Sequence, residues 1–173
     1  IITRTWTAED ECGNILEETQ VITVIDTVAP VLSAYPADTV VDCKDLVPAA
    51  PDITAFDECG PVPVVFTEII TNETCENRLT ITRTWTAADD CGNAVSATQV
   101  VTVIDTVPPT LSVAPNDTTL SCLDMVPPPA TLVVTDNCGD IPVIFTETVS
   151  DSLCENTLTI TRTWTAVDEC GNV

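Results

Sequence analysis

The stretch RLTITRTWTA at residues 78–87 alternates strictly between two kinds of side chain. One set consists of Leu79, Ile81, Arg83, Trp85 and Ala87, and the other consists of four threonines. Successive side chains of a β-strand point to opposite faces of the sheet. The stretch therefore predicts a strand with an apolar core face and a threonine-rich outer face.

Arg83 is the charged residue on this predicted core face, and a buried guanidinium group needs a partner. The neighbouring strand, expected at 62–70, carries Glu68 on the same face as Val64 and Phe66. We therefore expect an Arg83–Glu68 ion pair, and the same reasoning predicts a pair between Arg162 and Glu147. Two alternatives stay open: Arg83 lies at the sheet margin and extends to water, or the whole face contacts another chain.

The core of this stretch occurs three times along the chain, as ITRTWTAEDECGN (2–14), ITRTWTAADDCGN (81–93) and ITRTWTAVDECGN (160–172). The offset is 79 residues in both steps (81 − 2 = 79 and 160 − 81 = 79). A fixed period of domain size, without insertions, indicates tandem copies of one structural unit. We expect residues 1–27 to be the C-terminal part of a repeat, with its last two strands. Residues 28–106 are then a complete repeat, residues 107–173 a repeat lacking its last strand, and the chain an excerpt from a longer array.

Turn-forming Pro, Gly, Asp and Asn residues separate runs rich in Val, Ile and Thr, a pattern typical of all-β proteins. In the complete repeat we expect strands at 31–35, 38–43, 52–56, 62–70, 78–87 and 94–104. Two packed antiparallel sheets are the usual way to bury such apolar faces. The predicted architecture is a series of tandem immunoglobulin-like antiparallel β-sandwiches, stapled by disulfides.

Nine cysteines, four in each repeat, indicate a disulfide framework and an oxidising compartment. A zinc site is the weaker interpretation, because the chain has neither a CxxC pair nor a histidine.

The sandwich topology favours one of the three connectivities that four cysteines allow. The loops at 57–60 and 89–93 are expected at one end of the sandwich, and the segments around 43 and 75 at the other. This arrangement favours the pairs Cys59–Cys91 and Cys43–Cys75, with Cys138–Cys170 and Cys122–Cys154 in the next repeat. Cys12 is left over, because the partner expected for it would precede residue 1.

The chain is strongly acidic, with 5 basic and 27 acidic residues and a net charge of −22. This balance argues against binding to nucleic acid, which needs Lys and Arg against phosphate. No apolar run is long enough to predict a membrane span. No histidine is available for triad chemistry, and a carboxylate pair copied in every repeat would be an unusual active site, so we do not expect an enzyme.

Acidic residues recur in the linker between repeats and in two loops of each repeat. In the sandwich these segments meet at one end, which would bring together Asp26, Asp57 and Asp89, and likewise Asp105, Asp136 and Asp168. Grouped carboxylates repel one another unless a cation binds, and Ca²⁺ accepts six to eight oxygens in loose geometry. The sequence therefore suggests calcium at each joint, against the alternative that these residues serve as turn formers. Separately, the tripeptides DTV (38–40) and DTT (117–119) resemble an O-glycosylation motif of secreted proteins. The resemblance implies O-glycans at Thr39 and Thr118, against the alternative that these are ordinary turn residues.

The phrases RTWTAxDxCGN, TVIDTVPP and CxxxVPxPxxxxxTDNCG together resemble the HYR-like, immunoglobulin-like repeats of long secreted surface proteins of the Bacteroidetes type. The likeness covers the whole chain and implies an extracellular or cell-surface array of adhesin or filament repeats. One departure is that DECGPVPV (57–64) lacks the Asn found in TDNCGDIPV (135–143).

Two functions follow from these observations. The first is a structural or adhesive repeat that forms a stiff stalk or filament. The Pro-containing linkers favour this function because they restrict bending. Its partners would be neighbouring repeats or identical chains. The second is a carbohydrate- or protein-binding module of an adhesin, which would need an exposed aromatic platform although aromatic residues make up only 4% of the chain.

Overall fold

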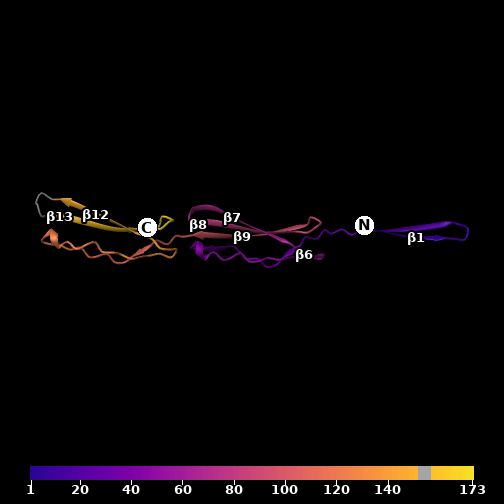
Figure 1. The fold of residues 1–173 in the computed structure, drawn as a ribbon, viewed down its shortest axis with the longest axis horizontal. Helices are drawn as coiled ribbons and strands as arrows, with labels where there is room; N and C mark the ends of the chain where they lie inside the picture. The colour runs from indigo at the N-terminus through magenta and orange to yellow at the C-terminus, as the bar shows by residue number, and fades with distance from the viewer. Residues whose placement is uncertain (152–156) are drawn as a thin grey trace. The chain divides into compact units, whose positions relative to one another are not determined.

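The computed structural model describes residues 1–151 and 157–173, and these residues form β-strands joined by loops and two short 3-10 helices, as predicted for an all-β protein (Figure 1). The elements in chain order are β1 (Ile2–Glu9), β2 (Ile15–Ile22), β3 (Val31–Leu32), β4 (Thr39–Val41), η1 (Lys44–Leu46), β5 (Ala55–Asp57), β6 (Gly60–Val62), β7 (Val64–Cys75), β8 (Arg78–Ala88), β9 (Ala94–Ile104), β10 (Thr110–Leu111), η2 (Leu123–Met125), β11 (Val134–Thr135), β12 (Val143–Asp151) and β13 (Leu158–Ala166).

Strand β8 contains the alternating stretch, and its side chains alternate in burial as the sequence predicts. Leu79, Ile81, Arg83, Trp85 and Ala87 are buried, and the threonines between them are partly exposed. The strand lies inside a four-stranded sheet with the order β4-β9-β8-β7, of which Figure 1 shows β7, β8 and β9 side by side. Because β9 and β7 flank β8, the apolar face of β8 is buried along the whole strand.

One strand pair departs from the antiparallel arrangement expected. Strand β4 runs parallel to β9, with Thr39 opposite Val101 and Val41 opposite Val103. Parallel strands need a long connection rather than a tight turn. The two partners here are separated by most of the repeat, which allows this pairing.

The main hydrophobic cluster joins β8 and β9. It contains Leu79, Ile81, Val101 and Val103, each at most 5% exposed, with Val41 and Val47 packed against it. Burying such side chains is the dominant favourable term in folding. The parallel strand β4 thus contributes directly to the core through Val41.

The remaining strands form smaller sheets. Strands β3, β5 and β6 form a three-stranded sheet, and β1–β2, β10–β11 and β12–β13 form two-stranded pairs. In the β12–β13 pair, Phe145 lies opposite Trp164 and Glu147 lies opposite Arg162. This register places the predicted ion pair of the second copy on adjacent strands.

The chain divides into two compact units that do not follow the 79-residue period. One unit contains residues 1–33, 53–65 and 86–96, and the other contains residues 34–52, 66–85 and 97–173. The second unit therefore combines parts of residues 28–106 with all of residues 107–173. The repeat boundaries expected from the sequence stay predictions.

The N-terminal hairpin shows how much burial depends on neighbours. Strand β1 carries the same phrase as β8, yet Trp6 is 56% exposed and Trp85 is 1% exposed. In the described residues β1 pairs with β2, whereas β8 has a strand on each side. The alternating pattern defines a strand, and its neighbours decide whether that strand is core.

Candidate functional site

In the second and third copies of the repeated phrase, the arginine forms an ion pair with the expected glutamate. Arg83 Nε donates to Glu68 Oε2 at 2.8 Å, and Arg162 Nε donates to Glu147 Oε2 at 2.7 Å. The Arg83 side chain is 5% exposed and that of Arg162 is 19% exposed. The margin and outward-facing alternatives therefore do not describe Arg83.

Buried Gln99 on β9 is a partner of Arg83 that the sequence reasoning missed. Arg83 Nη1 donates to Gln99 Oε1 at 3.3 Å, and Gln99 Nε2 donates to the Ala37 carbonyl oxygen at 2.9 Å. Gln99 is 2% exposed. The guanidinium charge is thus buried with two acceptors, which is the condition under which a buried charge is tolerated.

An aromatic pair lies beside each ion pair. The rings of Phe66 and Trp85, and those of Phe145 and Trp164, have centroids 5.3 Å apart in a tilted arrangement. Offset or tilted aromatic pairs at this separation are favourable. The Trp164 indole also donates from Nε1 to the Ala130 carbonyl oxygen at 3.0 Å.

The disulfides join different partners from those predicted. Cys43 is bonded to Cys138, and Cys75 is bonded to Cys170, with Cα atoms 5.2 and 5.3 Å apart. These separations are ordinary for disulfides. The predicted pairs Cys43–Cys75 and Cys138–Cys170 are therefore wrong, because each bond joins a cysteine of residues 28–106 to one of residues 107–173.

Hydrogen bonds around Asn77 explain why these cysteines find partners in residues 107–173. The Asn77 side-chain oxygen accepts a hydrogen bond from Lys44 N at 2.8 Å, and the Asn77 carbonyl accepts one from Asp105 N at 2.9 Å. These bonds hold the Cys43 segment, the β7–β8 turn after Cys75 and the linker together. Residues 107–173 directly follow the linker held here, and their cysteines Cys138 and Cys170 are bonded to Cys43 and Cys75.

The other described cysteines are unbonded. Cys12, Cys59, Cys91 and Cys122 are free and exposed, so the predicted Cys59–Cys91 disulfide is not found. The predicted Cys122–Cys154 pair involves Cys154, which lies outside the described residues. The pairing predicted from loop positions fails because each bonded partner lies 95 residues away, among residues 107–173.

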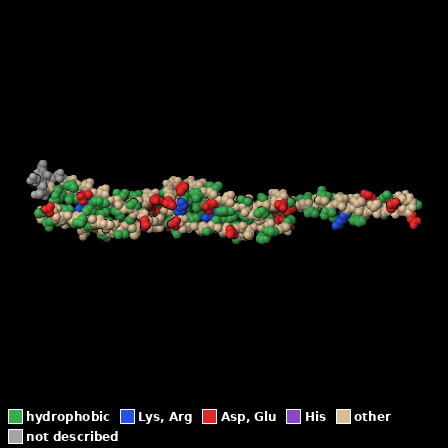
Figure 2. Space-filling view, in the orientation of Figure 1, with side chains coloured by type: hydrophobic (Ala, Val, Ile, Leu, Met, Phe, Trp, Pro, Cys, Tyr) green, Lys and Arg blue, Asp and Glu red, His purple; other side chains and the backbone are tan. Residues whose placement is uncertain are grey.

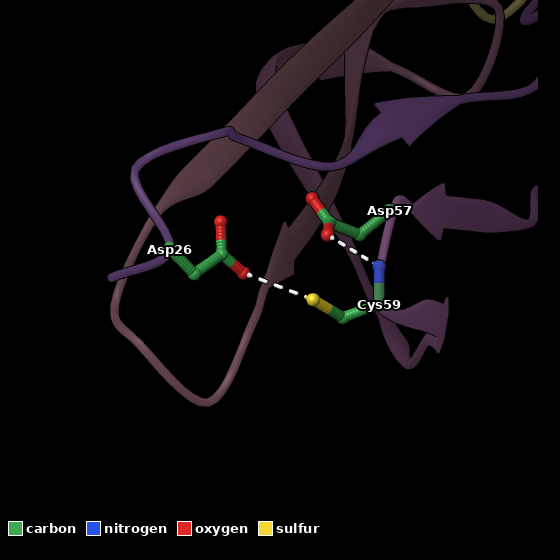
Figure 3. A group of neighbouring side chains, drawn as sticks. All are labelled: Asp26, Asp57 and Cys59. Atoms are coloured by element: carbon green, nitrogen blue, oxygen red, sulfur yellow. Dashed lines mark hydrogen bonds between the residues drawn. The ribbon is translucent and has the colours of Figure 1, made fainter. Parts of the chain in front are cut away.

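The linker and one loop bring acidic side chains together, as expected for part of the predicted metal set. Ligand atoms of Asp26, Asp57 and Cys59 all lie within 4.8 Å of one another (Figure 3). Asp57 Oδ1 accepts from Cys59 N at 3.0 Å, Asp26 Oδ1 accepts from Val28 N at 3.0 Å, and the Cys59 thiol donates to Asp26 Oδ2 at 3.6 Å. The hydrogen bond to the Asp26 carboxylate and the negative charge nearby raise the pKa of the Cys59 thiol above its ordinary value.

The same cluster recurs 79 residues later with Asp105, Asp136 and Cys138. Asp136 Oδ1 accepts from Cys138 N at 2.9 Å, and Asp105 Oδ1 accepts from Val107 N at 3.1 Å. Asp105 is 1% exposed. Oδ2 of Asp136, like Oδ2 of Asp57 in the first cluster, is buried and accepts no hydrogen bond. A buried carboxylate oxygen without a donor is costly, and a cation would satisfy it.

Asp89 and Asp168 do not join these clusters, contrary to the predicted metal set. The Asp89 carboxylate accepts hydrogen bonds from the backbone of Cys91 and Asn93 through Oδ1, and from the Asn93 side chain through Oδ2. Asp168 makes the same three bonds with Cys170 and Asn172. Both carboxylates are therefore used to shape their own loops, as the turn-forming alternative held.

The asparagine of the repeated CGN sequence supports both this loop and the linker. The Asn93 side chain donates to Asp89 Oδ2 at 2.8 Å and to the Asp26 carbonyl oxygen at 3.4 Å. Asn172 bonds Asp168 and the Asp105 carbonyl in the same way. The hydrogen bond from Asn93 lowers the pKa of Asp89, and Asn14 has the same effect on Asp10. The recurrence of this asparagine in all three CGN sequences is the sequence signal that could have revealed its role in holding the loop and the linker.

A cavity of about 230 Å³ lies beside the second cluster and the disulfides. Its lining includes Asp105, Asp136, Cys138 and Cys170, and its other charged residues are Lys44, Asp45, Glu76, Asp140, Asp168 and Glu169. Lys44 is paired with Glu76 at 3.7 Å between Nζ and Oε1. The walls therefore carry a large excess of negative charge, and Figure 2 likewise shows many more acidic than basic side chains on the visible face.

The two proposed glycosylation sites differ in accessibility. Thr118 is exposed in a loop, and Thr39 is partly buried in β4 opposite Val101. O-glycosylation of these threonines stays a prediction.

Comparison with known proteins supports the resemblance for the C-terminal part of the chain. Residues 110–173 match the family model of the HYR-like domain with 4 cysteines. That segment is similar to an extracellular, adhesion-type module, and the two disulfides fit an extracellular domain. No curated protein matches the chain. No solved structure matches it either.

In its described part, the structure contains no helix long and apolar enough to cross a membrane.

Proposed function

We propose that the chain is a structural or adhesive segment of a surface array, in which successive repeats are locked into a stiff stalk or filament. The observation that supports this most strongly is the pair of disulfides Cys43–Cys138 and Cys75–Cys170. A single covalent tether between two repeats leaves rotation about it, whereas two tethers at separate points oppose bending and twisting.

Non-covalent contacts reinforce the same joint. Asn172 donates to the carbonyl of Asp105 in the linker, and Asp105 N donates to the carbonyl of Asn77 in the preceding repeat. Pro108 and Pro109 fix their own φ angles and restrict the residues before them. Each of these features removes freedom from the segment that would otherwise act as a hinge.

The test is a measurement of rotational diffusion by ¹⁵N relaxation on the oxidised 173-residue chain. If the joint is stiff, residues 28–106 and 107–173 will share one rotational correlation time, and reduction with dithiothreitol will give two shorter ones. The matched control is the chain with Cys12→Ser and Cys59→Ser, which removes thiols but no disulfide. Independent tumbling of the two segments with both disulfides intact would contradict a stiff stalk.

We also propose that calcium binds at the joint, between Asp105 and Asp136 and in the same way between Asp26 and Asp57. In each carboxylate Oδ1 is occupied by a local backbone N–H. The unpartnered Oδ2 atoms of Asp57 and Asp136 suit a hard cation that prefers oxygen ligands. Cys138 contributes no thiolate, because its sulfur is in a disulfide.

Calcium binding is tested by titration calorimetry and by thermal unfolding of the oxidised chain, with and without EDTA. A ligand that binds only the folded state raises the unfolding temperature with its concentration. We expect Asp136→Asn to abolish the effect of calcium at the second cluster, and Asp140→Asn to preserve it, because Asp140 lines the cavity outside the cluster. An equal response of the two variants would show charge screening rather than a site.

A further inference from the structure

The two disulfides follow one spacing rule. Both join residues separated by 95 positions. This spacing equals one 79-residue period plus the 16 residues that separate successive cysteines within a repeat (79 + 16 = 95). Two bonds that obey the same rule indicate a linkage set by the repeat itself.

Cys59 and Cys91 occupy the positions of Cys138 and Cys170, one period earlier (59 + 79 = 138 and 91 + 79 = 170). Their loops have the same local structure as the bonded ones. Asp57 Oδ1 accepts from Cys59 N at 3.0 Å as Asp136 does from Cys138 N at 2.9 Å. Asp89 Oδ1 accepts from Cys91 N at 2.9 Å, and Asp168 accepts from Cys170 N at the same distance.

The loops of Cys59 and Cys91 are therefore already in the conformation that holds a bonded cysteine. Both thiols are free and exposed rather than joined to each other. The linker cluster beside them is also complete, with Asp26 next to Asp57 and Asn93 bonded to the Asp26 carbonyl. Cys59 and Cys91 thus differ from the bonded Cys138 and Cys170 in having no partner sulfurs among the described residues.

The other half of the linkage recurs too. Cys122 precedes η2 as Cys43 precedes η1, with extended backbone in both cases. Met125 N donates to the Cys122 carbonyl at 3.2 Å, as Leu46 N does to the Cys43 carbonyl at 3.0 Å. Cys122 is free and exposed, in the conformation from which Cys43 makes its bond.

We propose that Cys59 and Cys91 form a two-cysteine attachment site for a further copy of the same 79-residue repeat, whose counterparts of Cys43 and Cys75 bond to them. The inference rests on the proposed structural role and extends it from one linked joint to a periodic ladder of paired disulfides. Cys122 is part of the opposite half of such a ladder.

The chemistry requires an oxidant of the disulfide class, such as oxidised glutathione or a protein disulfide. A thiolate of one repeat attacks the oxidant's S–S bond and releases one thiol, which leaves a mixed disulfide. The thiolate of the other repeat attacks that mixed disulfide, forms the inter-repeat S–S bond and releases the second thiol. Each ladder bond thus loses two protons and two electrons, and the oxidant is reduced to two thiols.

The experiment compares the 173-residue chain with the same chain extended at its N-terminus by a copy of residues 1–79, which continues the period. The copy carries Asp42→Glu and Thr74→Ser as mass tags. Both chains are folded in a glutathione redox buffer, alkylated and mapped by non-reducing peptide mass spectrometry. The Cys43–Cys138 peptide, which both chains should contain, reports that the molecules analysed are folded.

We expect Cys59 and Cys91 to be alkylated in the 173-residue chain and to lose that labelling in the extended chain, where they link to the tagged copies of Cys43 and Cys75. Serine at those two cysteines of the copy should restore the labelling. A Cys59–Cys91 bond in either chain would overturn the proposal, as would alkylation of both thiols in extended molecules that contain Cys43–Cys138. Because stiffness is measured on the 173-residue chain, failure of the ladder and failure of the stalk are separate results.

Discussion

The partners of the disulfides can be identified by stability measurements alone, because the two pairings predict opposite patterns of additivity. The variants are Cys43→Ser, Cys138→Ser, Cys75→Ser and their combinations. They are made in a background where the other five cysteines are serine, so that stray thiols cannot exchange with the disulfides.

The magnitude follows from loop closure. Each bond closes a sequence separation of 95 residues. With one bond in place, the other closes a ring made of two 32-residue segments (75 − 43 = 32 and 170 − 138 = 32). The chain-entropy model assigns about 3 kcal/mol to a 15-residue loop and about 4.7 kcal/mol to a 100-residue loop. Breaking either bond alone should therefore cost about 4 kcal/mol of unfolding free energy.

The decisive comparison is between double variants. Cys43→Ser and Cys138→Ser break the same bond, so their combination should cost about as much as either alone, with an interaction energy of about −4 kcal/mol. Cys43→Ser with Cys75→Ser breaks both bonds and should cost about 8 kcal/mol, enough to unfold a domain of ordinary stability.

The assay is urea unfolding followed by tryptophan fluorescence, to which buried Trp85 contributes a signal that changes on exposure. The urea slope must stay comparable between variants for the free energies to be compared. Additive losses for Cys43→Ser and Cys138→Ser, together with no extra loss for Cys75→Ser in the Cys43→Ser chain, would refute the inter-repeat pairing. That result would support the bond within one repeat.

The remaining predictions concern the ion pairs and the loop carboxylates. Glu68→Gln should lower the unfolding free energy by about 1–3 kcal/mol, because it leaves a buried guanidinium with a weaker partner. Glu147→Gln should lower it less in the same urea assay, because its arginine partner is more exposed. Equal losses for the two variants would contradict this explanation. Asn93→Ala should raise the pKa of Asp89 in a carboxyl NMR titration, because the Asn93 hydrogen bond is the main cause of its lowered value. Since that pKa is lowered in the folded state, the stabilisation by the bond is complete above the unfolded pKa near 4 and is lost as the pH falls through the folded value. The stability difference between wild type and Asn93→Ala should therefore be constant above about pH 5 and shrink below about pH 4, and a difference that grew in acid would contradict the assignment.

The candidate site was partly accessible from the sequence. Asp26 and Asp57 could be brought together because the linker and the loop were both expected at one end of the repeat. The role of Asp89 could not be separated from theirs, because all three are acidic residues next to turns. Only the tertiary structure shows that the Asn93 side chain donates a hydrogen bond to Asp89 Oδ2 while Oδ2 of Asp57 is left without a donor.

The sequence by itself determined the all-β class and the strand that carries the core, and it proposed the ion pair of Arg83 with Glu68 among alternatives between which the structure decided. These depend on the two-residue alternation of side chains and on the pairing of adjacent strands, which act over short distances. Tertiary structure decided the partners of Cys43 and Cys75, the parallel pairing of β4 with β9 and the burial of Trp85 against the exposure of Trp6. The same residues recur with the 79-residue period, so the sequence pattern cannot say which copy of a residue a side chain will contact. The contact depends on the path of the linker, which is a property of the folded chain.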